Sequence, residues 1–143
     1  LGEKTHWCKA AIWRDTTRVP FIVVSSGVAK AGFRNNQPIS HVDIYPSLCD
    51  FAGIPKPAHL EGRSILTLLK DQSTTRDVAF LSYGPENTAA QSERYRYLRY
   101  EDGSEELYDH KKDPHEWTNL IGNEKYQKLT KKMRAQVLAF QKK

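Results

Sequence analysis

Val19 to Val24 is a short, almost continuous apolar run that is interrupted only by Pro20. A run without alternation is typical of a strand that is buried on both faces, as in a parallel sheet covered by helices. Pro20 is compatible with such a strand, because a proline near the start need not donate to the ladder. The pattern therefore predicts a buried strand over 19–24, after a polar loop with one helical turn over residues 1–18.

Two short helices are predicted after this strand. Apolar residues recur at helical spacing between Asp43, a suitable N-cap, and Gly53, a suitable helix stop. One or two further helical turns are predicted over residues 64–69. The polar stretch 71–77 that follows marks a boundary between two parts of the chain.

The apolar spacing changes to a period of two in the second half of the chain. Residues 78–83 and 95–100 read as strands, and residues 84–92 between them as a polar loop. Glu-Asp-Gly-Ser at 101–104 is a hairpin signal, because Asp-Gly readily supplies positive φ angles. Residues 106–109 form the returning strand, so this half is predicted to be an antiparallel meander.

A final helix is predicted after Asn123, which is a suitable cap. Apolar residues in this segment are spaced by three and four positions and form one stripe, while lysines occupy much of the remaining surface. The stripe consists of Tyr126, Leu129, Met133, Val137 and Phe140. We expect this face to pack on the small sheet.

The composition adds a mildly basic charge to this picture. The 143 residues include 22 Lys and Arg against 17 Asp and Glu, a formal net charge of +5. This favours anionic partners but is too weak to name one. No nucleic-acid-binding motif and no apolar run of membrane-spanning length is recognisable, so we expect neither nucleic acid nor a membrane as a partner. Cys8 and Cys49 have no zinc-site spacing, and we predict no metal site in this chain.

The densest chemistry lies at the start of the chain. Lys4, His6 and Lys9 fall within six positions of one another. Cationic and titratable groups this close together suit an anionic ligand such as sulfate, phosphate or carboxylate. A solvated loop with several lysines is the alternative interpretation of the same pattern.

Several motifs along the chain together resemble the C-terminal part of a type I sulfatase of the alkaline-phosphatase-like superfamily. The nearest group is the iduronate-2-sulfatase-like enzymes, which act on sulfated carbohydrates such as glycosaminoglycans. The motifs are Leu1-Gly2-Glu3-Lys4 with Trp7-Cys8-Lys9, Thr17-Arg18-Val19-Pro20, Val42-Asp43-Ile44-Tyr45-Pro46, Ala52-Gly53-Ile54-Pro55, Glu61-Gly62-Arg63-Ser64-Ile65, Tyr95–Tyr100 with Glu106–Asp109, Asp113-Pro114-His115-Glu116, and Asn119-Leu120.

This resemblance implies an enzyme that cleaves sulfate esters or sulfamates. Such enzymes use a formylglycine, made from Cys or Ser in a Cys/Ser-x-Pro-x-Arg motif, beside a bound calcium. Neither Cys8 nor Cys49 is followed by proline two residues later, and the family's calcium ligands lie upstream of the segment that matches Leu1. The resemblance therefore implies a fragment that completes its active site, with Ca²⁺, only together with the remainder of the catalytic domain.

The fold implied is α/β. Residues 1–72 would be the end of an alkaline-phosphatase-like α/β/α sandwich, and residues 73–143 a subdomain of antiparallel sheet plus C-terminal helix. We expect the isolated fragment to be inactive. The resemblance also implies an extracytoplasmic location (periplasmic, secreted or lysosomal), and a sulfated carbohydrate as substrate.

Lys9 is the candidate catalytic residue, because the lysine of the Trp-x-Lys motif resembles the family's active-site lysine. A fixed ammonium stabilises charge on the sulfuryl oxygens and on the departing oxygen. Lys4 and His6 lie in the same loop and are candidate substrate-binding residues.

A second candidate site is the predicted loop at 84–91, which in similar sulfatases contributes to the substrate pocket. Asn87 and Thr88 are its candidate substrate-binding residues. The chain departs from the family at Thr88 and Gln91, where His and Arg are expected. His59, in a proline-rich loop, is a further candidate.

Two other functions remain open at this point. The chain is also compatible with a non-catalytic module that binds sulfated glycans through its basic surface. A phosphatase or phosphodiesterase of the same superfamily is the third candidate, because sulfate and phosphate esters are alike in shape.

Overall fold

The structure, a computed structural model, describes residues 2–7 and 9–142. It contains two compact units. The sheet unit joins the residues up to Val19 with those from Phe80 onward, and the helical unit comprises Pro20–Ala79. The predicted division into residues 1–72 and 73–143 refers to a complete sulfatase, and it stays a prediction.

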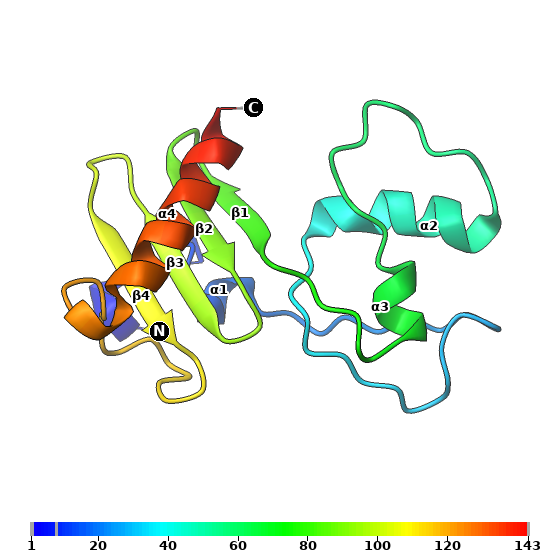
Figure 1. Ribbon diagram of the computed structural model, residues 1–143, viewed down its shortest axis with the longest axis horizontal. Helices are drawn as coiled ribbons and strands as arrows, with labels where there is room; N and C mark the ends of the chain where they lie inside the picture. The colour runs from blue at the N-terminus through cyan, green and yellow to red at the C-terminus, as the bar shows by residue number, and fades with distance from the viewer. Residues whose placement is uncertain (1, 8, 143) are drawn as a thin grey trace. The chain divides into compact units, whose positions relative to one another are not determined.

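A four-stranded sheet lies at the centre of the sheet unit, with its strands in chain order (Figure 1). The strands are β1 (Ala79–Tyr83), β2 (Asn87–Gln91), β3 (Tyr95–Arg99) and β4 (Glu105–Asp109). β3 pairs antiparallel with both β2 and β4. Gly103 supplies the positive φ of 82° in the turn between β3 and β4. The predicted antiparallel sheet and its hairpin turn are therefore confirmed.

The predicted cap, Asn123, lies at the start of a short helical turn that leads into helix α4 (Gln127–Gln141), not at the first residue of α4 itself. A 3-10 helix, η3 (Glu124–Tyr126), precedes it, and the Asn123 side chain accepts a hydrogen bond from the Lys125 amide at 3.0 Å. This bond satisfies one of the amides that a helix start leaves without a partner. None of the helices among the described residues combines the length and the apolar character needed to cross a membrane.

Helix α4 lies across one face of the sheet, against β2 and β3 (Figure 1). Met133 and Val137 are buried, and the Phe140 ring stacks on Phe80 with 4.4 Å between centroids. The prediction that this helix packs on the small sheet is confirmed.

The N-terminal segment covers the opposite face of the sheet. Ile12 is buried with Ala89, Leu98 and Tyr108, and the Trp13 ring packs against this cluster. The segment contains two short helical turns, η1 (Glu3–Thr5) and α1 (Arg14–Thr17). Because both faces of the sheet are covered, adjacent residues of β3 are buried on opposite sides.

The helical unit contains the two predicted helices. Its elements are η2 (His41–Asp43), α2 (Ile44–Ala52) and α3 (Leu66–Lys70). Gly53 ends α2 in the left-handed region, with φ of 67°, as its position in the sequence predicts.

Asp43 connects three segments of this unit. Its carboxylate accepts two hydrogen bonds from the Arg76 guanidinium, at 2.6 and 2.9 Å, and one each from the amides of Ser40 and Arg63, at 2.7 and 2.8 Å. Burial alone would raise the pKa of Asp43, but these bonds outweigh it and the pKa is lowered. The residue predicted as a simple N-cap thus serves as an ion-pair centre.

The predicted buried strand at 19–24 is wrong. No strand forms there, and the side chains of Ile22 and Val24 are 84 % and 94 % exposed. A strand buried on both faces needs neighbouring strands to satisfy its backbone. Among the described residues, the only sheet is the antiparallel one in the sheet unit.

The predicted polar loop at 84–92 is also wrong. Only residues 84–86 form the turn, and β2 begins at Asn87. Ala89 and Ala90 are almost fully buried on opposite faces of the sheet. Small side chains at these positions leave room for the layers on both faces, so packing outweighs their weak β propensity.

Candidate functional site

Two adjoining hollows lie on the sheet unit, beside the N-terminal segment. The smaller, about 220 Å³, is lined by His6, by Ala10 to Trp13, and by Tyr83. The larger, about 480 Å³, is lined by the turn between β3 and β4 and by Glu106. We call them the His6 hollow and the hairpin hollow. Trp13, Asn87 and Tyr100 line both.

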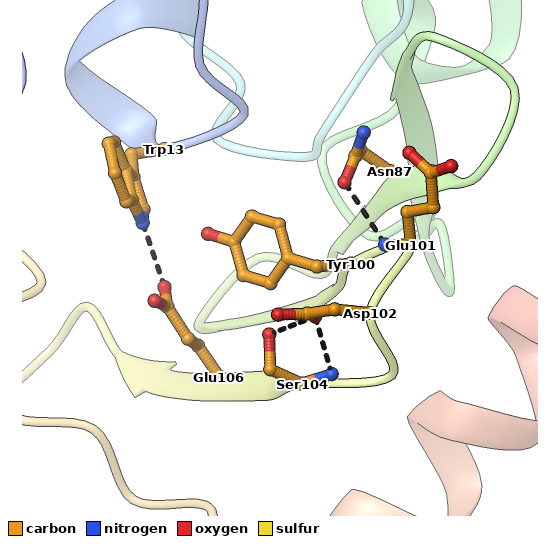
Figure 2. Close-up of a pocket in the computed structure, with 7 residues that line it drawn as sticks. All are labelled: Trp13, Asn87, Tyr100, Glu101, Asp102, Ser104 and Glu106. Carbon is orange, nitrogen blue, oxygen red and sulfur yellow. Dashed lines mark hydrogen bonds between the residues drawn. The ribbon is translucent and has the colours of Figure 1, made fainter.

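The walls of the hairpin hollow are held by hydrogen bonds (Figure 2). Trp13 Nε1 donates to Glu106 at 2.7 Å, and Asn87 Oδ1 accepts from the Glu101 amide at 3.2 Å. Asp102 accepts from the amide and hydroxyl of Ser104, which fixes the turn. The lining contains three carboxylates, those of Glu101, Asp102 and Glu106, and no cationic side chain. This hollow therefore favours ligand groups such as hydroxyls or amines and disfavours an anion.

A chain of polar contacts joins the two ends of the N-terminal segment to β4. Lys4 Nζ donates to the Tyr108 hydroxyl at 2.6 Å, and this hydroxyl donates to Glu106 at 2.9 Å. Glu106 also accepts from Trp13. Burial, reinforced by the charge of Glu106, raises the pKa of Tyr108 and of Tyr100. Both phenols are therefore neutral at ordinary pH, and the Tyr108 hydroxyl is a hydrogen-bond donor.

The structure brings two of the predicted site residues, His6 and Asn87, to the same hollow. The His6 ring meets the Trp13 ring edge-on, with 5.7 Å between centroids. Lys9 is exposed and immediately precedes Ala10, which lines the hollow. Cys8 lies outside the described residues.

The other predicted site residues lie in different surroundings. The Lys4 ammonium is in contact with the rings of Tyr108 and Trp13, at 4.3 and 5.1 Å from their centroids. Thr88 is fully buried and accepts a hydrogen bond from Gln141 at 3.1 Å. His59 is exposed in a turn of the helical unit. Their roles in substrate binding stay predictions.

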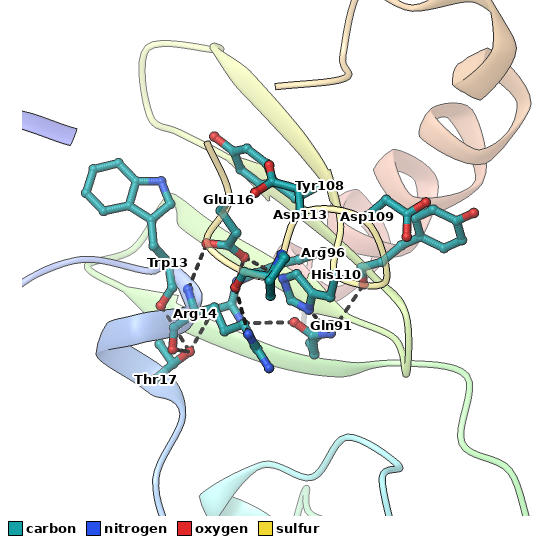
Figure 3. Close-up of polar contacts among 12 residues, drawn as sticks. Trp13, Arg14, Thr17, Gln91, Arg96, Tyr108, Asp109, His110, Asp113 and Glu116 are labelled. Carbon is teal, nitrogen blue, oxygen red and sulfur yellow. Dashed lines mark hydrogen bonds and ion pairs between the residues drawn. The ribbon is translucent and has the colours of Figure 1, made fainter. Parts of the chain in front are cut away.

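The sequence did not point to a buried polar cluster formed by Arg96, His110 and Glu116 (Figure 3). Arg96 and Glu116 are 4 % and 1 % exposed. Glu116 has a φ of 60°, in the left-handed region that residues other than glycine rarely adopt. Glu116 lies in a turn-rich segment without helical or strand periodicity. The hydrophobic pattern therefore gave no indication that this charged residue is buried.

Within this cluster the contacts are short. His110 Nε2 lies 2.7 Å from one carboxylate oxygen of Glu116, and the Arg96 guanidinium lies 3.7 Å from the same oxygen. Gln91 accepts a hydrogen bond from Arg96 at 3.0 Å. The buried charges are thus paired, as buried charges must be.

Among residues 2–7 and 9–142, no three His, Cys, Asp or Glu side chains come together in a group that could hold a metal ion. The residues described here therefore do not fit a calcium site. The calcium of a complete enzyme stays a prediction.

Comparison with protein families gives one match over nearly the whole chain. The family described as N-sulphoglucosamine sulphohydrolase, C-terminal, matches residues 2–143.

Curated proteins with similar sequences are sulfatases. A protein of Formosa agariphila named sulfatase is 33 % identical over 136 residues, which cover 94 % of this chain and 27 % of that protein. A delta 4,5-hexuronate-2-O-sulfatase of Bacteroides thetaiotaomicron is 32 % identical over 141 residues, covering 87 % of this chain and 28 % of the relative. The chain therefore spans little more than a quarter of the length of these relatives.

A solved structure has a similar fold. It is a complex with the substrate D-glucosamine-2-N,6-O-disulfate, and it matches with a TM-score of 0.58 and 26 % identity. The match covers 70 % of this chain and 23 % of that one.

Proposed function

Because the chain belongs to the family of N-sulphoglucosamine sulphohydrolase C-terminal regions, we propose that it is the C-terminal part of a sulfatase that hydrolyses sulfated carbohydrate. The observation that carries the proposal is the match over residues 2–143, together with relatives that are named sulfatases. Since the chain spans about a quarter of those relatives, the nucleophile and the calcium would belong to the remainder of the catalytic domain.

Lys9 would be the contribution of this chain to the reaction. Its exposed ammonium would lie against the sulfate and stabilise the negative charge that develops as the sulfur–oxygen bond breaks. Lysine suits this role because its compact head has three donors, which can contact a sulfate oxygen and a neighbouring hydroxyl together. By the family resemblance, the nucleophile would be a formylglycine upstream of this chain. The role proposed for Lys9 does not require it to contact calcium.

The two hollows would form part of the substrate rim. The rings of Trp13 and Tyr100 offer apolar faces to a sugar, and Asn87 and His6 offer hydrogen bonds to its hydroxyls. The solved structure with a sulfated glucosamine supports this substrate class. The named hexuronate-2-O-sulfatase supports the finer proposal that the protein is similar to iduronate-2-sulfatases.

The decisive experiment is turnover of 4-nitrophenyl sulfate by the full-length protein and its Lys9→Ala variant. We expect the variant to lose about 100- to 1,000-fold in kcat, because a group that stabilises transition-state charge is removed. Lys131→Ala, at an exposed position on α4, is the control and should retain full turnover. Residues 1–143 alone should show no hydrolysis.

Two results would contradict the proposal. Turnover of 4-nitrophenyl phosphate in preference to the sulfate would indicate a phosphatase of the same superfamily. Binding of sulfated glycan that weakens steeply with salt and is unchanged by Lys9→Ala, with no turnover, would indicate a binding module.

An extracytoplasmic location is a further proposal, and it rests on the family resemblance alone.

A further inference from the structure

Lys9 belongs to a segment that is attached to the sheet unit on both of its sides. On the upstream side, Lys4 contacts Tyr108 on β4. On the downstream side, three consecutive residues, 12 to 14, are hydrogen-bonded to the sheet or to the turn that follows it. The segment that carries Lys9 is therefore attached to the sheet unit at Lys4 and at residues 12 to 14.

The downstream attachment uses main-chain atoms. Arg96 Nε donates to the carbonyl oxygen of Ile12 at 3.0 Å, and a second nitrogen of the same guanidinium donates to that oxygen as well. Glu116 accepts a hydrogen bond from the Arg14 amide at 2.9 Å. Figure 3 shows Arg96 and Glu116 reaching the segment of Trp13 and Arg14 from the sheet and from the turn. These bonds fix the path of the backbone, whichever side chains it carries.

This arrangement is not explained by stability alone. A buried ion pair loses about as much in desolvation as it gains in attraction, so an apolar cluster would stabilise the fold equally well. Glu116 also has an unfavourable backbone conformation, with φ of 60°. The Arg96–Glu116 pair does what an apolar cluster cannot do, because it provides directed hydrogen bonds to one carbonyl and one amide of a particular segment.

We propose that Arg96 and Glu116 are positioning residues for Lys9: they clamp the backbone at Ile12 and Arg14 and so hold the lysine at a fixed place in the active site. The inference rests on the proposed function of Lys9. Neither residue contacts the substrate in this proposal, and both act through the segment to which they are bonded.

The test is made in the full-length protein with 4-nitrophenyl sulfate. Glu116→Gln keeps the size of the side chain but removes the charge that faces Arg96. We expect kcat to fall about 10- to 100-fold, as for residues that orient a catalytic group, with KM changed less than about threefold. Circular dichroism and the melting temperature establish that the variant is folded at the assay temperature.

Glu105→Gln is the matched control. Glu105 is also a largely buried carboxylate with an arginine partner, Arg134, but it faces α4 rather than the Lys9 segment. We expect this variant to lose stability and to retain kcat when folded. Equal kcat in folded Glu116→Gln and Glu105→Gln would overturn the positioning role.

If Glu116→Gln does not fold, Arg96→Lys is measured instead. Lysine keeps the charge but loses the two-nitrogen contact with the Ile12 carbonyl oxygen. A lower kcat than in Glu105→Gln supports the positioning role, and an equal kcat overturns it.

A double-mutant cycle separates positioning from a purely structural effect. If Glu116 acts through Lys9, Glu116→Gln in the Lys9→Ala background changes kcat by less than about twofold. The same 10- to 100-fold loss in both backgrounds would contradict the inference. Unchanged turnover in Lys9→Ala alone would instead overturn the proposed function, so the two failures are distinguishable.

Discussion

Asp43 and Glu116 are both buried carboxylates, and each is matched by a buried guanidinium. They differ in what else they bind. Asp43 bonds to two amides within the helical unit, whereas Glu116 bonds to the Arg14 amide and to His110. In both cases one side chain joins three segments that are far apart in the sequence. Loss of either carboxylate leaves a buried positive charge without its partner.

Asp43→Asn is therefore expected to destabilise the helical unit by about 3–5 kcal/mol, the usual cost of breaking a buried pair. Asparagine retains one acceptor oxygen but cannot bind both nitrogens of Arg76 as a charged pair. Urea unfolding followed by circular dichroism measures the effect. Asp71→Asn is the control: Asp71 is exposed and its carboxylate accepts hydrogen bonds from nearby Ser73 and Thr74, so the urea midpoint of this variant should stay close to that of the wild type.

The same pair predicts a pH dependence with a definite sign. The pKa of Asp43 is lower in the folded protein than the ordinary aspartate value of about 3.9. Its stabilisation is therefore fully present above that value and is lost as pH falls through the lower, folded pKa. Between pH 5 and the acid limit of folding, the urea midpoint of the wild type should fall more steeply than that of Asp43→Asn. Parallel curves would contradict this assignment.

At the same scale, the sequence could predict part of the candidate site. Clustering of chemistry in the N-terminal segment pointed to His6, and the structure brings His6 to a hollow with Asn87. The sequence could not show that Thr88 is buried, because a threonine in a polar stretch is compatible with both a loop and a covered strand. The contacts of Glu116 could not be predicted, since they depend on a left-handed backbone and on partners 6 to 102 positions away.

At the scale of elements, α4 and β2 show why some segments are predictable and others are not. The apolar stripe of α4 follows from a spacing that extends over four turns, and the structure confirms it. Asn123 caps the 3-10 helix η3, which leads into α4. β2 has five residues, Asn-Thr-Ala-Ala-Gln, with no alternation. Its strand conformation comes from the β3 ladder and from the layers on both faces, which local sequence does not contain.

Removal of a core side chain from α4 tests how the helix holds the sheet. Met133 is 2 % exposed, so Met133→Ala should cost about 2–5 kcal/mol of unfolding free energy through lost burial and a residual cavity. Leu138→Ala, on the same helix but 38 % exposed, should cost much less. Urea unfolding compares the two variants, and equal costs would show that α4 does not pack through this stripe.

At the scale of the whole molecule, the N-terminal residues and the last 64 residues form one compact unit, and the residues between them form another. The Lys9 segment is therefore part of the same folded body as the meander and α4. The residues of the helical unit are therefore inserted, in sequence, between the two parts of the sheet unit. The exposed apolar side chains at Phe21, Ile22 and Val24 lie in that inserted unit and are not covered by any strand among the described residues.

This organisation predicts that stability is divided between the two units, because each has its own buried residues and its own ion pairs. Native-state amide hydrogen exchange of Asp43→Asn should show reduced protection in α2, with little change at Ala89 or Leu98. Met133→Ala should show the reverse. The two substitutions act as controls for each other, since both are destabilising and each is buried in a different unit. If both variants reduce protection equally throughout the chain, the units unfold together, and the Lys9 segment would then depend on the helical unit as well as on the sheet.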